Sequence, residues 1–268
     1  MTMKKRRNMI KKYLILFITV LMFLAVSACT NNSDSQNATD SSASQTSSAI
    51  CKWMGTAQEP TTIILVRHGE TDYNIEGRYQ GRLDIPLNET GLEQADQLAE
   101  YLKDTAIDAV VTSPLQRANV TGQKVAELHG LSVSTDERLA EIDYGDWAGC
   151  YKKDLKAKFP DDYKIWEETP WLFTMPNGEN LEMLGTRGAE AIYEIACNNA
   201  GKTVLIAAHS TFNQAVLCEL LGLGYEHVNQ VAQDNTSISV LRYDGAWKIL
   251  VWNAIPHRGM LADGLPLQ

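Results

Sequence analysis

The stretch that decides the fold reads Thr62-Ile63-Ile64-Leu65-Val66-Arg67-His68-Gly69-Glu70-Thr71. Its first five residues form an apolar run rich in β-branched side chains, which predicts a buried strand. An arginine, a histidine and a glycine follow at the end of that strand. Because ligands of open α/β sheets bind just beyond the carboxyl ends of the strands, this order predicts a functional site at Arg67 and His68. A strand that merely ends in polar loop residues is the alternative interpretation.

Two further apolar runs end in chemically active side chains. Residues 203–208 predict a buried strand that ends at His209, and residues 108–112 predict another, which leads through Ser113-Pro114 to Arg117. If these strands lie parallel to the first one, the two histidines and the arginines converge at one rim of the sheet. The sequence therefore predicts a shared site built from three strand ends.

The rest of the domain alternates helices with strands. Apolar spacing predicts helices at residues 92–102 (capped by Asn88 or Thr90), from Ser113-Pro114 to about His129, at 181–200, and at 212–221 with Gly222 as the stop. Residues 72–87 are expected to form a loop, and residues 151–180 an irregular region of short helices with a flap. Residues 238–243 and 247–251 predict a hairpin around Asp244-Gly245. This order predicts an α/β three-layer sandwich with a mainly parallel central sheet and helices on both faces.

The residue types at the predicted rim suit phosphoryl transfer through nitrogen. A neutral imidazole attacks phosphorus and gives a phosphohistidine. Arg67 and Arg117 can grip the non-bridging oxygens, and a protonated His209 would add another donor. Glu141, in a loop after a short strand expected at 131–134, can protonate the leaving alkoxide if its pKa is raised, and can then act as a base on water. Since arginines and imidazolium take the place of Mg²⁺, no metal and no cofactor are expected.

Together these residues resemble the signature of the histidine phosphatase superfamily, which includes the cofactor-dependent phosphoglycerate mutases. The matching residues are Arg67-His68-Gly69-Glu70-Thr71, Asn74, Gln80-Gly81, Leu87, Gly91-Leu92, Gln94-Ala95, Ser113-Pro114-Leu115-Gln116-Arg117-Ala118, Leu139, Glu141, Gly145, Trp147, Gly149 and His209. The resemblance extends over nearly everything from Ile63 to Val251. It implies a phosphoglycerate mutase-like fold.

The resemblance also implies a role for each site residue. His68 would be the phosphorylated nucleophile and Glu141 the proton donor; Arg67, Arg117 and His209 would form the phosphate pocket, Asn74 would contact the phosphate, and Gln80 and Gly81 would line the substrate side. Only the family spacing selects Glu141 from the neighbouring acids Asp136, Glu137, Asp143 and Asp146. One departure is visible, because Ser210-Thr211-Phe212 follow the second histidine where many members have glycine or aspartate. A less permissive backbone is expected there, which bears on the substrate and leaves the chemistry unchanged.

The N-terminal region has the pattern of an export signal. Six cations lie between Lys4 and Lys12, and residues 13–28 are apolar or small, a run too short for a typical membrane-spanning helix. Small residues precede Cys29 as in a bacterial lipobox, so residues 1–28 are interpreted as a lipoprotein signal peptide and Cys29 as the lipidated residue. An ordinary signal peptide or an uncleaved anchor is the alternative.

Four segments follow from this pattern. They are the signal peptide at 1–28, the lipidated cysteine with a flexible polar linker at 29–60, the catalytic domain at 61–256 and a C-terminal tail at 257–268. The domain is long enough for one sizeable core. The protein is therefore expected outside the cytoplasmic membrane, attached to it by lipid.

Charge and cysteine content narrow the possible partners. Without the six N-terminal cations, 18 Lys and Arg face 33 Asp and Glu, a net charge of −15 from residue 29 onward. This acidity argues against nucleic acid as a partner, so local arginines must make any phosphate site. Cys51, Cys150, Cys197 and Cys218 form no CxxC pair, which argues against structural zinc, and their three possible disulfide pairings stay open.

The sequence is compatible with three functions. The leading one is hydrolysis of a small phosphate ester by a metal-independent, lipid-anchored phosphomonoesterase. The second is a mutase of the phosphoglycerate type. The third is a catalytically silent binding lipoprotein, against which the intact set of catalytic residue types argues.

Overall fold

The computed structural model describes residues 59–258. The predicted signal peptide, Cys29, the polar linker as far as residue 58, Cys51 and most of the C-terminal tail lie outside the described residues. Among residues 59–258, no helix has the length and apolar content that crossing a bilayer requires.

A six-stranded sheet forms the centre of the domain, in the order β3-β2-β4-β1-β5-β6. The strands are β1 (Thr61–Arg67), β2 (Ala109–Thr112), β3 (Val133–Thr135), β4 (Thr203–Ala208), β5 (Ile238–Tyr243) and β6 (Trp247–Ala254). β1, β2, β3 and β4 pair in parallel, whereas β5 pairs antiparallel with both β1 and β6. The predicted mainly parallel sheet with a terminal hairpin is confirmed.

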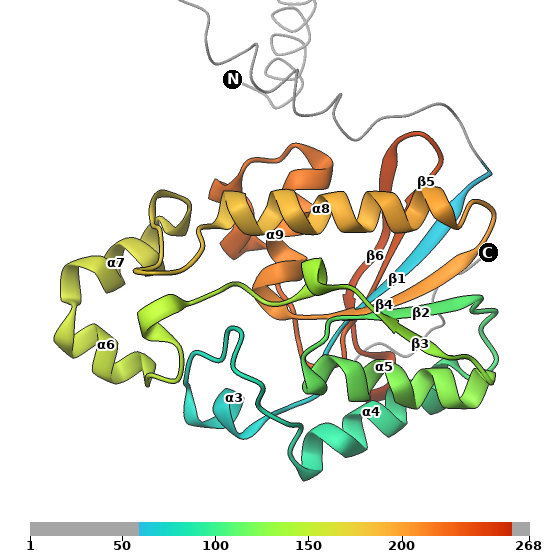
Figure 1. The fold of residues 1–268 in the computed structure, drawn as a ribbon, viewed down its shortest axis with the longest axis horizontal. Coiled ribbons are helices and arrows are strands. Elements are labelled where there is room, and N and C mark those ends of the chain that lie inside the picture. Colours follow the sequence, from blue (N-terminus) through green and yellow to red (C-terminus); the bar gives the residue numbers. More distant parts are fainter. Residues whose placement is uncertain (1–58, 259–268) are drawn as a thin grey trace, which may run out of the picture. The chain divides into compact units, whose positions relative to one another are not determined.

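Helices cover both faces of the sheet (Figure 1). One face carries α4 (Glu89–Leu102) and α5 (Gln116–His129), and the other carries α8 (Leu181–Asn198) and α9 (Ser210–Leu221). Side chains of β1 alternate between two apolar cores, with Ile63 and Leu65 in one and Ile64 and Val66 in the other. A strand buried on both faces requires such a continuous apolar run, and this confirms the predicted three-layer sandwich.

The expected loop at 72–87 is wrong in its first part, because Asp72–Glu76 forms the short helix α3. The Thr71 side chain accepts a hydrogen bond from the Asn74 N–H, and Asn74 Oδ1 accepts one from the Thr71 N–H. Gly77 ends the helix in a left-handed conformation at φ 67°. This reciprocal capping stabilises one helical turn that apolar spacing does not predict. Smaller shifts affect β3, which starts two residues later than expected, and α5, which starts at Gln116.

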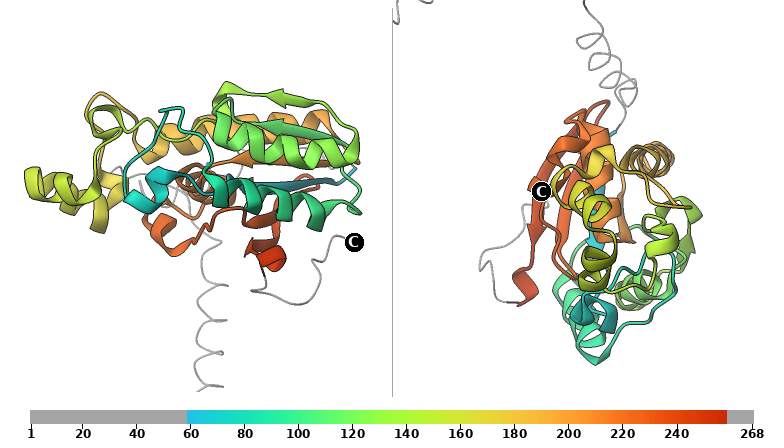
Figure 2. Two further views of the ribbon diagram at one scale, coloured as in Figure 1. Left: turned by 90° about the horizontal axis from the view of Figure 1, so that it is seen from below. Right: turned by 90° about the vertical axis from the view of Figure 1, so that its left-hand side faces the viewer.

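The irregular region predicted at 151–180 consists of short helices. They are α6 (Lys152–Lys158), α7 (Pro160–Glu168) and the 3-10 turn η3 (Pro170–Leu172). Figures 1 and 2 show α6 and α7 extending past the carboxyl ends of β1 and β4. We call residues 148–175 the flap. Its position allows it to contact whatever binds at the strand ends.

Candidate active site

Sheet register brings three predicted strand ends together. Arg67 of β1 lies opposite Ala208 of β4, and Ala207 lies opposite Thr112 of β2. The hydrogen bonds continue one residue further, because the His68 N–H donates to the Ala208 carbonyl and the Ser113 N–H to the Ala207 carbonyl, both at 3.0 Å. The rings of His68 and His209 consequently lie 5.3 Å apart between centroids.

His68 is held as a neutral imidazole with one nitrogen available. Its Nδ1 lies 2.6 Å from the Gly69 carbonyl oxygen, which can only accept, so Nδ1 carries the proton and Nε2 carries the lone pair. Burial, reinforced by the positive charges of Arg117 and Arg67, lowers the pKa of His68 well below the usual imidazole value. The residue is 3 % exposed, so its side chain is restrained by its surroundings, yet it lines the cavity.

Gly69 permits a close approach that fixes this strand end. A Cβ atom at Gly69 would lie 2.4 Å from the Gly91 carbonyl oxygen of α4, and a Cβ at Gly91 would lie 2.0 Å from the Glu70 carbonyl oxygen. The two glycines therefore let the backbone after β1 pack directly on the first turn of α4. The Gly69 N–H also donates to Thr121 Oγ1 at 3.1 Å. Replacing either glycine would displace the backbone that carries His68.

Hydrogen bonds to backbone carbonyls orient two guanidinium groups. Arg117 is fully buried and donates from Nη1 to the Leu83 carbonyl at 2.8 Å and from Nη2 to the Gly81 carbonyl at 2.7 Å. Arg67 donates from Nη1 to the Gln233 carbonyl at 2.6 Å. Burial lowers the pKa of Arg117 to about 10 despite the opposing charge of Glu141, and it lowers the pKa of Arg67 as well. Both groups stay charged near neutral pH and face the same cavity.

The Glu141 carboxyl group is held at the N-terminus of α9. Its Oε1 accepts from the N–H groups of Ile142 at 3.0 Å and Phe212 at 2.9 Å, and its Oε2 accepts from the Thr211 N–H at 3.2 Å. Burial raises the pKa of Glu141, although these N–H donors and Arg117 oppose the shift. Because α9 begins at Ser210, the residues after His209 are helical and need no glycine. The departure noted in the sequence is thus compatible with the site.

A cavity of about 260 Å³ collects most of the predicted residues. Its lining includes Arg67, His68, Asn74, Gln80, Gly81, Arg117 and Glu141. His209 lies behind His68 instead of lining the cavity; it is fully buried, and its Nε2 lies 2.8 Å from Ser113 Oγ. Burial and the charge of Arg117 lower the pKa of His209 well below the usual value, so the imidazolium expected from the sequence is disfavoured in the absence of an anion.

Asn74 is oriented by its own helix. Its Oδ1 accepts from the Thr71 N–H at 3.2 Å and from Asn235 Nδ2 at 3.4 Å. With the oxygen occupied by protein donors, the Nδ2 amide is the end that an anion in the cavity would accept from. Asn235 also donates to the His68 carbonyl at 3.0 Å, so the loop before β5 supports the Asn74 side chain and the His68 backbone.

Sequence reasoning missed several residues of the cavity wall. They are Arg78, Tyr79, Tyr144, Lys152, Ser210 and Thr211. Arg78 is stacked beside Tyr73, with its guanidinium carbon 3.9 Å from the ring centroid. Lys152 belongs to α6, in the region that the sequence left irregular. Tyr79 and the pair Ser210-Thr211 directly adjoin the predicted residues Gln80 and His209, and this adjacency could have identified them. No periodicity or motif distinguishes Lys152, because the flap brings it to the site only in three dimensions.

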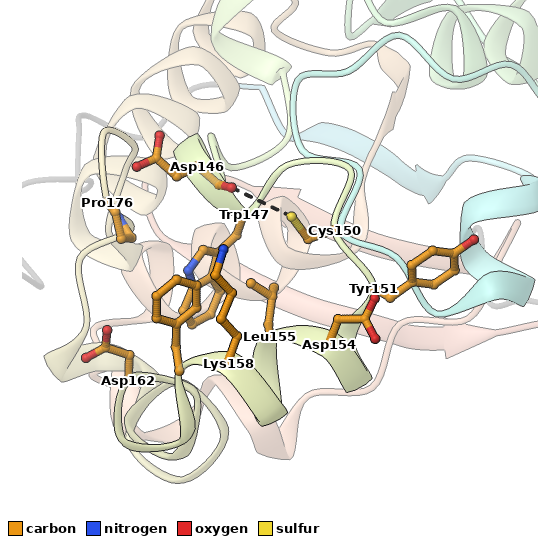
Figure 3. A pocket seen from close by; sticks show the side chains of 10 residues that line it. Asp146, Trp147, Cys150, Tyr151, Asp154, Leu155, Lys158, Asp162 and Pro176 are labelled. Atoms are coloured by element: carbon orange, nitrogen blue, oxygen red, sulfur yellow. Dashed lines mark hydrogen bonds between the residues drawn. The ribbon is translucent and has the colours of Figure 1, made fainter.

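Two larger cavities lie near the site. One, of about 500 Å³, lies along α6 and is lined by Trp147, Cys150, Leu155 and Lys158 together with Asp146, Asp154 and Asp162 (Figure 3). Three carboxylates against one cation make it unsuited to phosphate. The other, of about 430 Å³, shares Tyr79, Lys152 and Thr211 with the site cavity and continues to Tyr163 and Trp166.

No cluster of three potential metal ligands from His, Cys, Asp and Glu occurs within residues 59–258. Cys150, Cys197 and Cys218 are free thiols in this part of the chain, so none of them pairs with another. Each of the three full pairings that the sequence left open includes a bond between two of these thiols, so none of the three occurs; Cys51 itself lies outside the described residues.

Comparison with known proteins agrees with the geometry. Residues 63–255 match the family described as the histidine phosphatase superfamily (branch 1). Phosphoserine phosphatase 1 of Hydrogenobacter thermophilus is 35% identical over 182 residues, which cover 68% of this chain and 86% of that protein.

Solved structures give the same result. A protein called YhfR from Bacillus stearothermophilus superposes with a TM-score of 0.71 at 30% identity, covering 74% of this chain and 98% of that one. Phosphoserine phosphatase of Entamoeba histolytica, solved with 3-phosphoglyceric acid, gives a TM-score of 0.66 at 26% identity over 74% of this chain and 98% of that one. This chain therefore belongs to branch 1 of the histidine phosphatase superfamily.

Proposed function

We propose that the protein hydrolyses phosphate monoesters through a phosphohistidine at Nε2 of His68. The observation that carries this proposal is the neutral His68, with its lone pair on Nε2, in a cavity that also contains the buried Arg117 guanidinium, the partly buried Arg67 guanidinium and the buried Glu141 carboxyl group. The two guanidinium groups supply positive charge where the non-bridging oxygens of the ester would lie. They take the place that a metal ion has in other phosphatases, so the proposal needs no metal.

The first half-reaction transfers the phosphoryl group to the protein. The His68 Nε2 lone pair forms an N–P bond while the bond between phosphorus and the alcohol oxygen breaks. The Glu141 carboxyl group, whose pKa is raised by burial, gives its proton to the departing alkoxide. The products are a free alcohol and a phosphohistidine.

The second half-reaction releases phosphate. The Glu141 carboxylate takes a proton from a water molecule as the water oxygen bonds to phosphorus, and the N–P bond returns its electron pair to Nε2. Inorganic phosphate leaves, and both side chains regain their starting protonation states. Arg67, Arg117 and Asn74 hold the phosphoryl oxygens in both steps, and Gln80 and Gly81 line the substrate side.

The alcohol part of the substrate is proposed to occupy the 430 Å³ cavity that joins the site. Tyr79, Lys152 and Thr211 belong to both cavities, so a molecule in one continues into the other. Lys152 adds a cation at this junction. A second anionic group on the substrate, such as a carboxylate, would suit it. The 3-phosphoglyceric acid bound to the Entamoeba histolytica relative has that chemistry.

The cellular setting is also proposed from the sequence. Residues 1–28 would serve as the signal peptide, Cys29 as the lipidated residue, residues 29–60 as the linker and residues 61–256 as the catalytic domain, on the outer side of the cytoplasmic membrane. The cationic start, the apolar run and the small residues before Cys29 support this arrangement.

Trapping in an alkaline detergent quench tests the proposed intermediate, because a phosphohistidine is stable to alkali and is hydrolysed in acid. Wild-type protein mixed with ³²P-labelled substrate should carry label that is stable to alkali and labile to acid, and His68→Ala should carry none. Equal labelling of the two proteins would refute His68 as the nucleophile. Offering phosphoglycerate with bisphosphoglycerate in the same assay distinguishes the mutase alternative, since isomer exchange faster than phosphate release would replace hydrolysis as the main activity.

A further inference from the structure

Arg187 of α8 reaches the backbone that carries Glu141. Its Nη1 donates to the Arg138 carbonyl at 2.7 Å and to the Ala140 carbonyl at 2.8 Å, and its Nη2 donates to the Glu141 carbonyl at 3.0 Å. One guanidinium group thus satisfies three carbonyl oxygens within four consecutive residues. Backbone acceptors in such a loop have no sheet partner, so their order depends on this side chain.

Glu179 binds both Arg187 and the backbone on the C-terminal side of Glu141. Arg187 donates to its two carboxylate oxygens, from Nε at 2.8 Å and from Nη2 at 2.9 Å. Glu179 Oε2 accepts from the Asp143 N–H at 2.9 Å, and the Glu179 N–H donates to the Asp143 carbonyl at 2.9 Å. The pair therefore grips the segment on both sides of Glu141, at residues 138–141 and at Asp143. We call Arg187 and Glu179 the acid-loop clamp.

The clamp also reaches the phosphate side of the cavity. Glu179 Oε1 accepts from Arg82 Nη2 at 3.0 Å, and the residue before Arg82, Gly81, supplies the carbonyl that accepts from Arg117. Glu179 is 8 % exposed and the Arg187 side chain is mostly buried, which makes this ion pair stronger than a surface one, whereas the Arg82 side chain is about half exposed. The loop of the proposed proton donor and the loop that aims Arg117 are thus joined through one carboxylate.

We propose that Arg187 and Glu179 are positioning residues that hold the Glu141 carboxyl group in line with the leaving oxygen. The proposal rests on the proposed function, in which Glu141 donates the proton. The clamp fixes the Glu141 main chain, while the α9 N-terminus holds its side chain through Thr211 and Phe212. Because proton transfer requires a donor within hydrogen-bond reach, a small movement of this loop reduces the acid step first.

The test compares two substrates on Arg187→Gln, Arg187→Lys and Glu179→Gln. An alkyl phosphate needs the acid, whereas p-nitrophenyl phosphate has a leaving group that departs without a proton. For Arg187→Gln and Glu179→Gln we expect kcat to fall about 10- to 100-fold for the alkyl phosphate and less than about 3-fold for p-nitrophenyl phosphate. Arg187→Lys keeps the charge but cannot form the fork, so an intermediate loss is expected.

Lys124→Ala is the control. Lys124 of α5 pairs with Asp96 of α4 near the surface, on the face of the sheet opposite α8 and away from residues 138–143. This variant should leave both substrates within about 2-fold of wild type. Thermal unfolding of every variant shows whether the domain is folded, and if Arg187→Gln does not fold, Arg187→Lys and Glu179→Gln decide the question.

Each outcome has one meaning. Equal slowing of both substrates by folded clamp variants, or no slowing of either, would overturn the positioning role. Loss of phosphohistidine trapping in wild-type protein would overturn the proposed function instead, since that assay does not depend on the clamp. Retained trapping with p-nitrophenyl phosphate in Glu179→Gln, together with slow alkyl turnover, supports the proposal.

Discussion

The strand-end site and the flap differ in how firmly the fold holds them. His68, Arg117 and His209 are at most 3 % exposed, and they follow β1, β2 and β4, whose register is fixed by the parallel sheet. In the flap, Lys152 is exposed and Leu172 is 71 % exposed. The proposed chemistry thus rests on the most constrained part of the domain, whereas several of the proposed contacts to the substrate's alcohol part come from the short helices of the flap.

This difference suggests a division of tasks. Substitutions at the strand ends should alter the reaction with every substrate, because the phosphoryl group is common to all of them. Substitutions in the flap should change the preference among substrates and leave the phosphoryl chemistry intact. The following predictions test that division, from the largest expected effect to the smallest.

Glu141→Gln should reduce kcat for an alkyl phosphate by about 10²- to 10⁴-fold and for p-nitrophenyl phosphate by much less, since only the alkoxide needs the proton. The pH dependence of wild-type activity also tests the acid role of Glu141. Glu141 must be protonated in the first step, and burial raises its pKa, so wild-type activity on alkyl phosphates falls as the pH rises through that raised pKa.

The lowered pKa of His68 keeps the nucleophile neutral well into the acid range, so the acid limb lies below the usual imidazole titration. Glu141→Gln should remove the alkaline limb of the pH profile on alkyl phosphates. The exposed Glu137 supplies the control, since Glu137→Gln should keep both limbs. An equal loss for both substrates would contradict the acid role of Glu141.

Arg117→Lys should reduce kcat/KM by about 10²-fold for alkyl and aryl esters alike. A lysine has one nitrogen and cannot contact the Leu83 and Gly81 carbonyls while also facing the phosphoryl oxygens. Steady-state kinetics with both substrates measure the effect, and Arg242→Lys, at a half-exposed arginine of β5, serves as the control. A loss of kcat/KM for only one of the two esters would contradict the proposal that strand-end residues act on every substrate and flap residues on substrate preference.

Lys152→Met should raise KM about 5-fold for phosphate esters that also carry a carboxylate, which corresponds to about 1 kcal/mol for an exposed ion pair. p-Nitrophenyl phosphate, which has no carboxylate, should change less than about 2-fold. Lys153→Met on the same helix is the matched control, because Lys153 is absent from the cavity wall. A change in kcat shared by both substrates would show that the flap takes part in the chemistry.

Much of the strand-end site could be predicted because strand ends and site residues coincide in the sequence. An apolar run followed by Arg67-His68, and another followed by His209, needs only parallel pairing to bring the two rings 5.3 Å apart. α3 was missed because one turn stabilised by a capping box has no apolar periodicity. Lys152 and the acid-loop clamp were missed because their partners lie far away in sequence: Arg187 is 46 residues from Glu141.

The sequence by itself determined the α/β class, the parallel strands, the terminal hairpin and which side chains follow the strand ends, since each follows from local periodicity or from residues at a strand end. Only the tertiary structure decided which nitrogen of His68 is free, that Glu141 is held by the N-terminus of α9, and that His209 lies behind His68. Protonation and orientation depend on burial and on hydrogen bonds between distant segments, and these exist only once the chain is packed.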